Sequence, residues 1–167
     1  DSGYGVIPRL SSRRQPLYRK APTASSIEKR IKNWHHSYHS LLIQAFGQSQ
    51  KLFKKTILLD IHSMPQTSPE LPDIVVGNLN GLSASKEFSD LIIGILNKFR
   101  FTHSMNTPYA GGFITERYGH PSKNQHAIQI EINRKLYLQK NYKVCSEAIN
   151  NLTGLLNEII KSLSSVC

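Results

Sequence analysis

The stretch KTILLDIHSMP, residues 55–65, contains a short apolar run that ends in polar residues. This pattern predicts a buried β-strand that stops abruptly. Because side chains alternate along a strand, we expect Asp60 and His62 on the same side of it. Functional side chains of α/β proteins collect at the carboxyl ends of such strands. His62 is therefore a candidate zinc ligand, general base or hydrogen-bonded structural residue.

Length and composition are those of one ordinary domain. The chain has 167 residues, of which 39% are hydrophobic, enough for a sizeable core. No apolar run approaches the roughly 18–20 residues that span a bilayer, and no signal peptide is visible at the start. Cys145 and Cys167 have no metal-site spacing and indicate a reducing compartment. We expect a cytoplasmic protein without a membrane partner.

Positive charge is concentrated in the first third of the chain. The formal net charge is +10, and residues 1–55 carry eleven Lys or Arg against two acids. Such asymmetry favours binding of anions or nucleic acid, although a solvated basic face is the more common explanation. Without an aromatic-rich strand or a zinc-finger spacing, nucleic acid is an unlikely partner.

Apolar periodicity predicts helices alternating with strands. The expected helices are Ser26 to Phe46 or Gln48, Ser83 or Ser85 to Lys98, and Lys143 to Leu163. The expected further strands are Asp73–Gly77, Phe101–Met105 and His126–Asn133. This alternation predicts an α/β protein with a mixed or mainly parallel sheet.

The first helix has a capping box, Ser25 to Glu28, and two histidines one turn apart. His35 and His39 could chelate a metal, but without the glutamate of a zincin motif a polar helix edge near a pocket is favoured. The predicted apolar stripe of this helix consists of Ile27, Ile31, Trp34, Tyr38, Leu41, Leu42 and Ala45.

The strand His126–Asn133 alternates apolar and polar residues, and its polar groups come from His126, Gln129, Glu131 and Asn133. One face would pack in the core while the other carries functional chemistry, as Glu and Asn are poor strand formers. A solvent-facing edge strand is the alternative. The pair Gly111-Gly112 allows either a close approach to a ligand or an ordinary tight turn.

Four motifs follow one another in a distinctive order: LDIHSM (59–64), DIVVG (73–77), NTPYAGGF (106–113) and QIEINR (129–134). Together they resemble the N-formylglutamate amidohydrolase family. Further matches are Gly5–Pro8, Arg30-Ile31, Tyr38-His39 and Tyr118-Gly119, so the resemblance extends from Gly5 to Tyr137.

The resemblance implies a three-layer α/β/α fold with a mixed, mainly parallel sheet, similar to zinc carboxypeptidases and aspartoacylases (phosphorylase/hydrolase-like). It also implies a zinc-dependent amidohydrolase of histidine catabolism that converts N-formyl-L-glutamate to formate and glutamate. In that pattern His62 is a zinc ligand, Asp60 orients a ligand or the water, and Glu131 is the general base and acid.

A small anionic, amino-acid-derived substrate needs cationic partners. Arg134, Arg117 and Arg30 are candidates, because a guanidinium matches a carboxylate bidentately. Each could equally be a structural ion-pair partner. Within the family motif, Tyr109, Gly111 and Asn106 are further candidates for substrate binding.

One departure from the family pattern concerns its earlier metal motif, a histidine followed closely by a glycine-rich turn. This motif would lie before Asp1, and no HxxE pair replaces it. We therefore expect a single domain, residues 1–167, that lacks its N-terminal part and has an incomplete zinc site. The alternative is a non-catalytic fragment or family member that binds an anionic partner through the basic N-terminal third.

Overall fold

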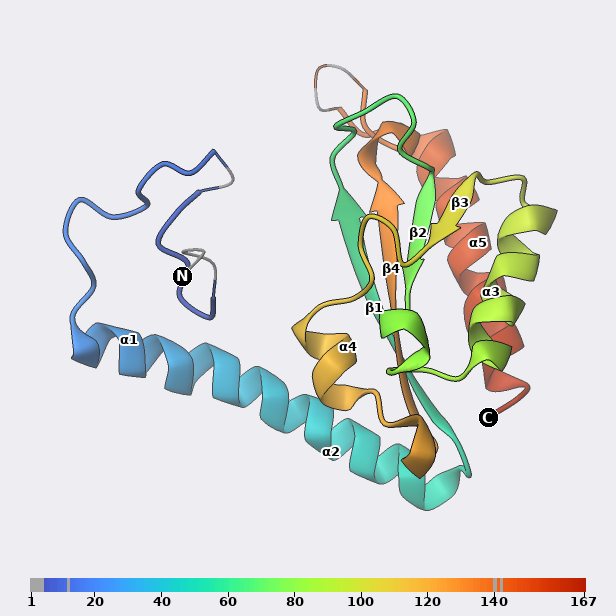
Figure 1. Ribbon diagram of the computed structural model, residues 1–167, viewed down its shortest axis with the longest axis horizontal. Coiled ribbons are helices and arrows are strands. Elements are labelled where there is room, and N and C mark those ends of the chain that lie inside the picture. The colour runs from blue at the N-terminus through green and yellow to red at the C-terminus, as the bar shows by residue number, and fades with distance from the viewer. Residues whose placement is uncertain (1–4, 12, 140, 142) are drawn as a thin grey trace. The chain divides into compact units, whose positions relative to one another are not determined.

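The structure is a computed structural model that describes residues 5–11, 13–139, 141 and 143–167. The chain forms two compact units, Asp1–Leu52 and Phe53–Cys167. Each unit is described by itself below, and Figure 1 gives the labels of the helices and strands.

The first unit consists of a loop region and a long helical run. The run comprises α1 (Ala24–Arg30), a π-helical segment η1 (Ile31–His36) and α2 (Ser37–Leu52). Its start is capped by Thr23, whose hydroxyl accepts a hydrogen bond of 3.3 Å from the amide of Ser26. The predicted helix is therefore present, but the cap is Thr23 rather than the capping box at Ser25.

The predicted apolar stripe of this helix does not form a core. The side chain of Trp34 is 76% exposed, and Tyr38 and Leu41 are exposed as well. The buried residues of α2 are His39 and Phe46. A π-helical turn contains an extra residue, so the residues that follow η1 are rotated away from the stripe that a regular 3.6-residue period predicts.

The second unit is built on a four-stranded sheet with the order β1-β4-β2-β3. The strands are β1 (Thr56–Met64), β2 (Ile74–Gly77), β3 (His103–Met105) and β4 (Gln125–Asn133). β1 pairs with β4 in parallel and β2 with β3 in parallel, whereas β2 and β4 are antiparallel. The mixed, mainly parallel sheet predicted from the sequence is confirmed.

The strand at residues 55–65 was expected to be buried, but β1 lies at one edge of the sheet. Residues 61–63 of this strand are open to solvent, and Ile61 is 44% exposed. An edge strand has a neighbour on one side only, which explains why an apolar run here does not produce full burial. β4 lies between β1 and β2, which excludes the edge-strand interpretation of residues 126–133.

Helices cover both faces of this sheet (Figure 1). α3 (Lys86–Lys98) and α5 (Ser146–Ser164) pack on one face, where β4 contributes Ile128, Ile130 and Ile132 to the core. The short helix α4 (Phe113–Tyr118), which periodicity did not predict, contacts β4 and β1. The described residues of this unit also form the single-turn 3₁₀ helices η2 (Leu79–Gly81), η3 (Pro121–Lys123) and η4 (Arg134–Leu136).

The core between the sheet and α3 and α5 supplies the rigid support of this unit. Phe88, Ile92 and Leu96 of α3 are fully buried, and each such side chain stabilises the fold by about 1.5–3 kcal/mol. His126 belongs to this face as well, with its ring 4.6 Å from that of Phe88. The prediction that His126 belongs with the polar residues of this strand was therefore wrong. Residue 126 is separated from the core isoleucines by even numbers of residues, so its side chain points to the same side of the sheet as theirs.

Across the described part of the chain, none of the helices is both long enough and apolar enough to cross a membrane.

Candidate functional site

The sheet face opposite α3 and α5 carries a cluster of polar side chains, which we call the polar face. It comprises Asp60 and His62 of β1 and Gln129 and Glu131 of β4. Asp60 is the register partner of Gln129, and His62 is the register partner of Glu131. Because side chains at paired positions leave a sheet on the same side, the alternation of the two strands brings these four groups together.

Asp60 and His62 interact directly. Oδ2 of Asp60 lies 2.9 Å from Nε2 of His62. The carboxylate is mostly buried, while the imidazole is about half-exposed, with 47% of its side-chain surface accessible. A carboxylate that engages one ring nitrogen fixes the orientation of the ring and directs the other nitrogen toward a ligand. In this arrangement Nδ1 of His62 is the nitrogen that could bind a metal.

Glu131 is a buried carboxylate with only 9% of its surface exposed. Nε2 of Gln129 donates a hydrogen bond of 2.9 Å to Oε1 of Glu131. Burial raises the pKa of Glu131 above its ordinary value, and the negative charge of Asp60 raises it further. His62, Arg134 and the hydrogen bond from Gln129 oppose this rise in the pKa without reversing it. A raised pKa suits a carboxyl group that must both accept and return a proton near neutral pH.

Arg134 lies where η4 follows β4. Its Nε donates to Oγ of Ser63 over 3.2 Å, and its Nη2 donates to the carbonyl oxygen of Ser63 over 3.3 Å. These two bonds hold the guanidinium at the end of β1. Its positive charge acts on the pKa of Glu131. Of the three predicted arginines, Arg134 is the one whose charge acts on a carboxyl group of the polar face.

Arg117 and Arg30 have other surroundings. Arg117, in the last turn of α4, lies 5.8 Å from the ring centroid of Phe113 and 5.9 Å from that of Tyr118. Arg30 belongs to the first unit, where Nη1 donates to Oη of Tyr18 over 2.8 Å. Their proposed roles with substrate stay predictions.

In the loop between β3 and α4, Asn106 and Gly111 stabilise the conformation of the loop itself. Asn106 has a positive φ of 58°. Its Oδ1 accepts from the amide of Asn78 over 2.9 Å, and its Nδ2 donates to Oδ1 of Asn78 over 3.0 Å. Gly111 has a φ of 143°, and a Cβ there would lie 2.5 Å from Oγ1 of Thr115. Tyr109 is half-buried in the same loop. Whether these residues also touch substrate stays a prediction.

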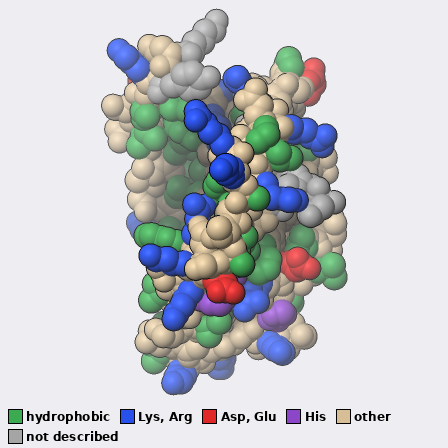
Figure 2. Space-filling view, turned by 90° about the vertical axis from the view of Figure 1, so that its left-hand side faces the viewer, with side chains coloured by type: hydrophobic (Ala, Val, Ile, Leu, Met, Phe, Trp, Pro, Cys, Tyr) green, Lys and Arg blue, Asp and Glu red, His purple; other side chains and the backbone are tan. Residues whose placement is uncertain are grey.

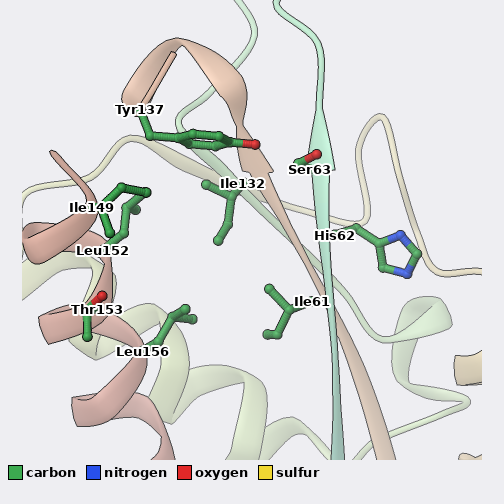
Figure 3. Close-up of a pocket in the computed structure, with 9 residues that line it drawn as sticks. All are labelled: Ile61, His62, Ser63, Ile132, Tyr137, Ile149, Leu152, Thr153 and Leu156. Carbon is green, nitrogen blue, oxygen red and sulfur yellow. The ribbon is translucent and has the colours of Figure 1, made fainter. Parts of the chain in front are cut away.

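An apolar pocket of about 350 Å³ lies on the opposite side of β1 (Figure 3). Its lining includes Ile61 of β1, Ile132 of β4, and Leu156 with other residues of α5. Figure 3 shows the imidazole of His62 pointing away from this pocket, although His62 borders it. An apolar lining offers no partner for a charged ligand, so the polar face rather than this pocket is the candidate functional site.

The profile of the N-formylglutamate amidohydrolase family matches residues 1–138. The chain belongs to this family. The four motifs around His62, Gly77, Gly111 and Glu131 all lie within the matched region, so the resemblance predicted from them is confirmed.

Relatives within the family are named as enzymes. The chain is 26% identical over 144 residues to the N-formylglutamate deformylase of Pseudomonas putida, a match that covers 81% of this chain and 54% of the relative. It is 24% identical to the N-formylglutamate deformylase of Pseudomonas aeruginosa, covering 95% and 64%, respectively. The chain thus spans between half and two thirds of the length of these curated relatives.

Solved structures agree with the fold. The N-formylglutamate amidohydrolase from Ralstonia eutropha JMP134 superposes with a TM-score of 0.86 at 26% identity, over 96% of this chain and 61% of that chain. A gene product from Agrobacterium tumefaciens superposes with a TM-score of 0.71 at 18% identity, over 96% and 62%, respectively. The second similarity concerns the fold alone.

The side chains of His62 and Asp60 fit one part of a zinc site. His62 with its Asp60 partner has the chemistry of one histidine ligand and its supporting carboxylate. Among the residues that the structure describes, no group of three or more His, Cys, Asp or Glu side chains is arranged to hold a metal. Zinc binding by His62 would therefore need further ligands from elsewhere.

Sequence reasoning did not assign a role to Gln129, on the polar face, or to Ser63, at the end of β1. Gln129 orients Glu131, and Ser63 holds Arg134. Gln129 could have been identified from its parity, because it stands two residues before Glu131 in an alternating strand. Nothing in the sequence pairs Ser63 with Arg134, which lie 71 residues apart.

Proposed function

We propose that this protein is a zinc-dependent amidohydrolase that cleaves the amide bond of an N-acyl amino acid such as N-formyl-L-glutamate. The observation that carries the proposal is the buried carboxyl group of Glu131 opposite the Asp60–His62 pair on the neighbouring strand. The names of its relatives support the same reaction class.

The proposed reaction adds water across the amide bond and releases formate and glutamate. Zinc, when bound with His62 as one ligand, would supply a Lewis acid that makes water a stronger nucleophile at neutral pH. Glu131 accepts a proton from the attacking water as the C–O bond forms. It then returns this proton to the amide nitrogen as the C–N bond breaks, and the amine leaves.

The neighbours of Glu131 and His62 have positioning roles in this scheme. Gln129 donates to Oε1 of Glu131 and limits the rotation of the carboxyl group. Asp60 keeps the His62 ring in one orientation. Both contacts lie within the sheet, where backbone pairing fixes the strands, so the two reacting groups are held before the substrate arrives.

The substrate of this reaction carries carboxylates, and Arg134 is positioned to bind one of them. Ser63 engages its Nε and Nη2, and Nη1 is the nitrogen directed away from these two contacts. Arg117, exposed on α4, is the second candidate. A guanidinium beside the polar face would favour anionic over neutral N-acyl compounds.

The experiment that tests this function is a formate-release assay with the full chain, N-formyl-L-glutamate and added Zn²⁺. We expect formate release that stops after dialysis against a chelator and returns when zinc is restored. N-formyl-L-glutamine, which lacks one carboxylate, should react less well. Formate release no faster than that of a Glu131→Gln variant would contradict the proposal.

A further inference from the structure

A second pocket, of about 350 Å³, lies entirely within the first unit. Residues 6–8 form one wall, and Tyr18, Arg30, Trp34 and His35 form the remainder. The loop before α1 and the turn at which α1 becomes π-helical therefore meet in one concave surface. Its volume falls within the range of pockets that bind small molecules.

Arg30 is the charged group of this pocket. Its Nη1 donates to Oη of Tyr18 over 2.8 Å, and its Cζ lies 5.4 Å from the centroid of the Tyr18 ring. None of the ion pairs formed within the described ranges includes Arg30. Glu28 is the only acidic residue at positions 5–52, so positive charge dominates this part of the chain.

Basic side chains are also prominent on the molecular surface. Figure 2 shows Lys and Arg side chains spread over the face that it presents, where they outnumber the acidic side chains. A guanidinium in so basic a part of the chain attracts anions and can bind a carboxylate through two parallel N–H groups. The hydrogen bond to Tyr18 uses one N–H of Nη1, which leaves the other edge of the fork for a ligand.

The remaining lining is mainly apolar. Val6, Ile7 and Pro8 supply aliphatic surface, and the ring of Trp34 lies one helical turn beyond Arg30. Arg30 and Trp34 flank the start of the π-helical segment η1. Such segments often occur at functional sites, because the wider turn displaces side chains from their regular positions. A ligand with an anionic head and an apolar tail would thus find a cationic partner in Arg30 and an apolar wall in residues 6–8 and Trp34.

We infer that this pocket binds a small organic carboxylate that carries a short apolar chain. The carboxylate contacts Arg30 and the Tyr18 hydroxyl, which accepts from Arg30 and donates its own proton to the ligand. The apolar chain packs between residues 6–8 and Trp34. Binding of this kind requires no hydrolysis, so it can be tested apart from the proposed enzymatic function.

The chain offers an internal probe, because Trp34 is its only tryptophan. We would titrate the full-length chain with hexanoate and follow Trp34 emission, with hexanamide as the neutral analogue of the same shape. Ligand-observed NMR would detect binding independently of any change in emission. We expect hexanoate to bind with a Kd on the order of 1 mM and hexanamide to bind at least tenfold more weakly.

Variants separate the site from general electrostatic attraction. Arg30→Gln should weaken hexanoate binding roughly tenfold or more, as expected for a lost charge-assisted hydrogen bond. Tyr18→Phe should weaken it several-fold. Lys29→Gln removes the same charge from the neighbouring position, outside the pocket lining, and should change the Kd less than twofold. Circular dichroism would verify that each variant is folded.

Three results would overturn the inference. The first is equal binding of hexanoate and hexanamide, or binding of neither by NMR. The second is an equal loss of affinity in Lys29→Gln and Arg30→Gln. The third is displacement of hexanoate by inorganic phosphate at equal concentration, which would make the pocket a general anion site without selectivity for the apolar chain.

Discussion

His62 and Glu131 are direct register partners on the adjacent parallel strands β1 and β4. Neighbouring strands are about 4.8 Å apart, so the imidazole and the carboxyl group leave the same face of the sheet side by side. One belongs to an edge strand and is half-exposed, while the other belongs to a central strand and is buried. The pair therefore combines a group that solvent and ligands can reach with a carboxyl group whose pKa burial raises.

The first prediction concerns the proton transfer by Glu131. Glu131→Gln keeps the size of the side chain but removes its capacity to accept a proton. A positioned acid–base group contributes about 10²–10⁴-fold to the rate, so kcat for N-formyl-L-glutamate should fall by roughly that factor. Zinc content, measured by atomic emission, should be unchanged. A folded variant with near-normal kcat would remove Glu131 from the mechanism, and loss of zinc would instead identify it as a ligand.

The second prediction is that His62 binds zinc. We expect His62→Ala to lower the zinc content and the zinc affinity of the purified protein, because replacing a histidine ligand removes one of the few strong donors of such a site. His36→Ala is the matched control, since His36 is an exposed histidine of the first unit. Equal zinc occupancy in the wild type and a folded His62→Ala protein would contradict the assignment.

Much of the second unit could be predicted from local patterns. The alternation in residues 126–133 and the stripe from Phe88 to Leu96 each place apolar side chains at the period of their element. Both elements occur where they were predicted and share one core. The same alternation placed Glu131 opposite the core isoleucines. Each of these features depends on the periodicity of side chains within a single helix or strand, so one sequence is sufficient to predict them.

Other features depend on the partners of an element and could not be predicted locally. The edge position of β1, the contact between Ser63 and Arg134, and the exposure of Trp34 all depend on tertiary structure. An apolar run has the same sequence pattern at an edge as in the centre of a sheet. The π-helical turn after Arg30 also shifts the apolar stripe without any Gly or Pro to mark it.

The third prediction distinguishes Arg134 from Arg117, both of the second unit. Arg134→Lys keeps the charge but loses the planar fork, so kcat/KM for N-formyl-L-glutamate should fall by roughly tenfold, mainly through KM. Arg117→Lys should have a smaller effect, because Arg117 contacts aromatic rings of its own helix. Steady-state kinetics of both variants checks this. Wild-type kinetics for Arg134→Lys, or a larger loss for Arg117→Lys, would reverse the ranking.

The fourth prediction tests whether Gly111 is required by the backbone. Gly111→Ala forces a side chain into a left-handed conformation at φ 143° and against Oγ1 of Thr115. We expect the free energy of unfolding to fall by about 1–3 kcal/mol or more. Gly94→Ala is the control, because a Cβ there meets no atom within 4 Å and the position is an exposed site of α3. That variant should be more stable by about 0.5–1 kcal/mol.

Urea denaturation would measure both glycine variants. Equal stability of Gly111→Ala and the wild type would mean that the loop relaxes at no cost. In that case a requirement for glycine at position 111 would have to come from ligand binding instead.

The last prediction concerns the pKa of Glu131, followed in the metal-free protein by ¹³C NMR of its carboxyl group. Burial raises this pKa, the charge of Asp60 adds to the rise, and the hydrogen bond from Gln129 lowers it. Asp60→Asn should therefore lower the pKa of Glu131 relative to the wild type. Gln129→Met, which removes the donor but keeps the volume, should raise it. Shifts in the same direction would contradict this account of the site.

The raised pKa also has a consequence for stability. Because the folded state favours protonated Glu131, its contribution is fully present below the pKa of an unfolded-chain glutamate and is lost as pH rises through the higher folded pKa. Glu131→Gln abolishes this dependence. As pH rises from the unfolded pKa through the folded pKa of Glu131, the free energy of unfolding of the wild type should therefore fall relative to that of Glu131→Gln. At lower pH the difference between the two proteins should be constant. A difference that does not change with pH would show that the folded protein does not perturb Glu131.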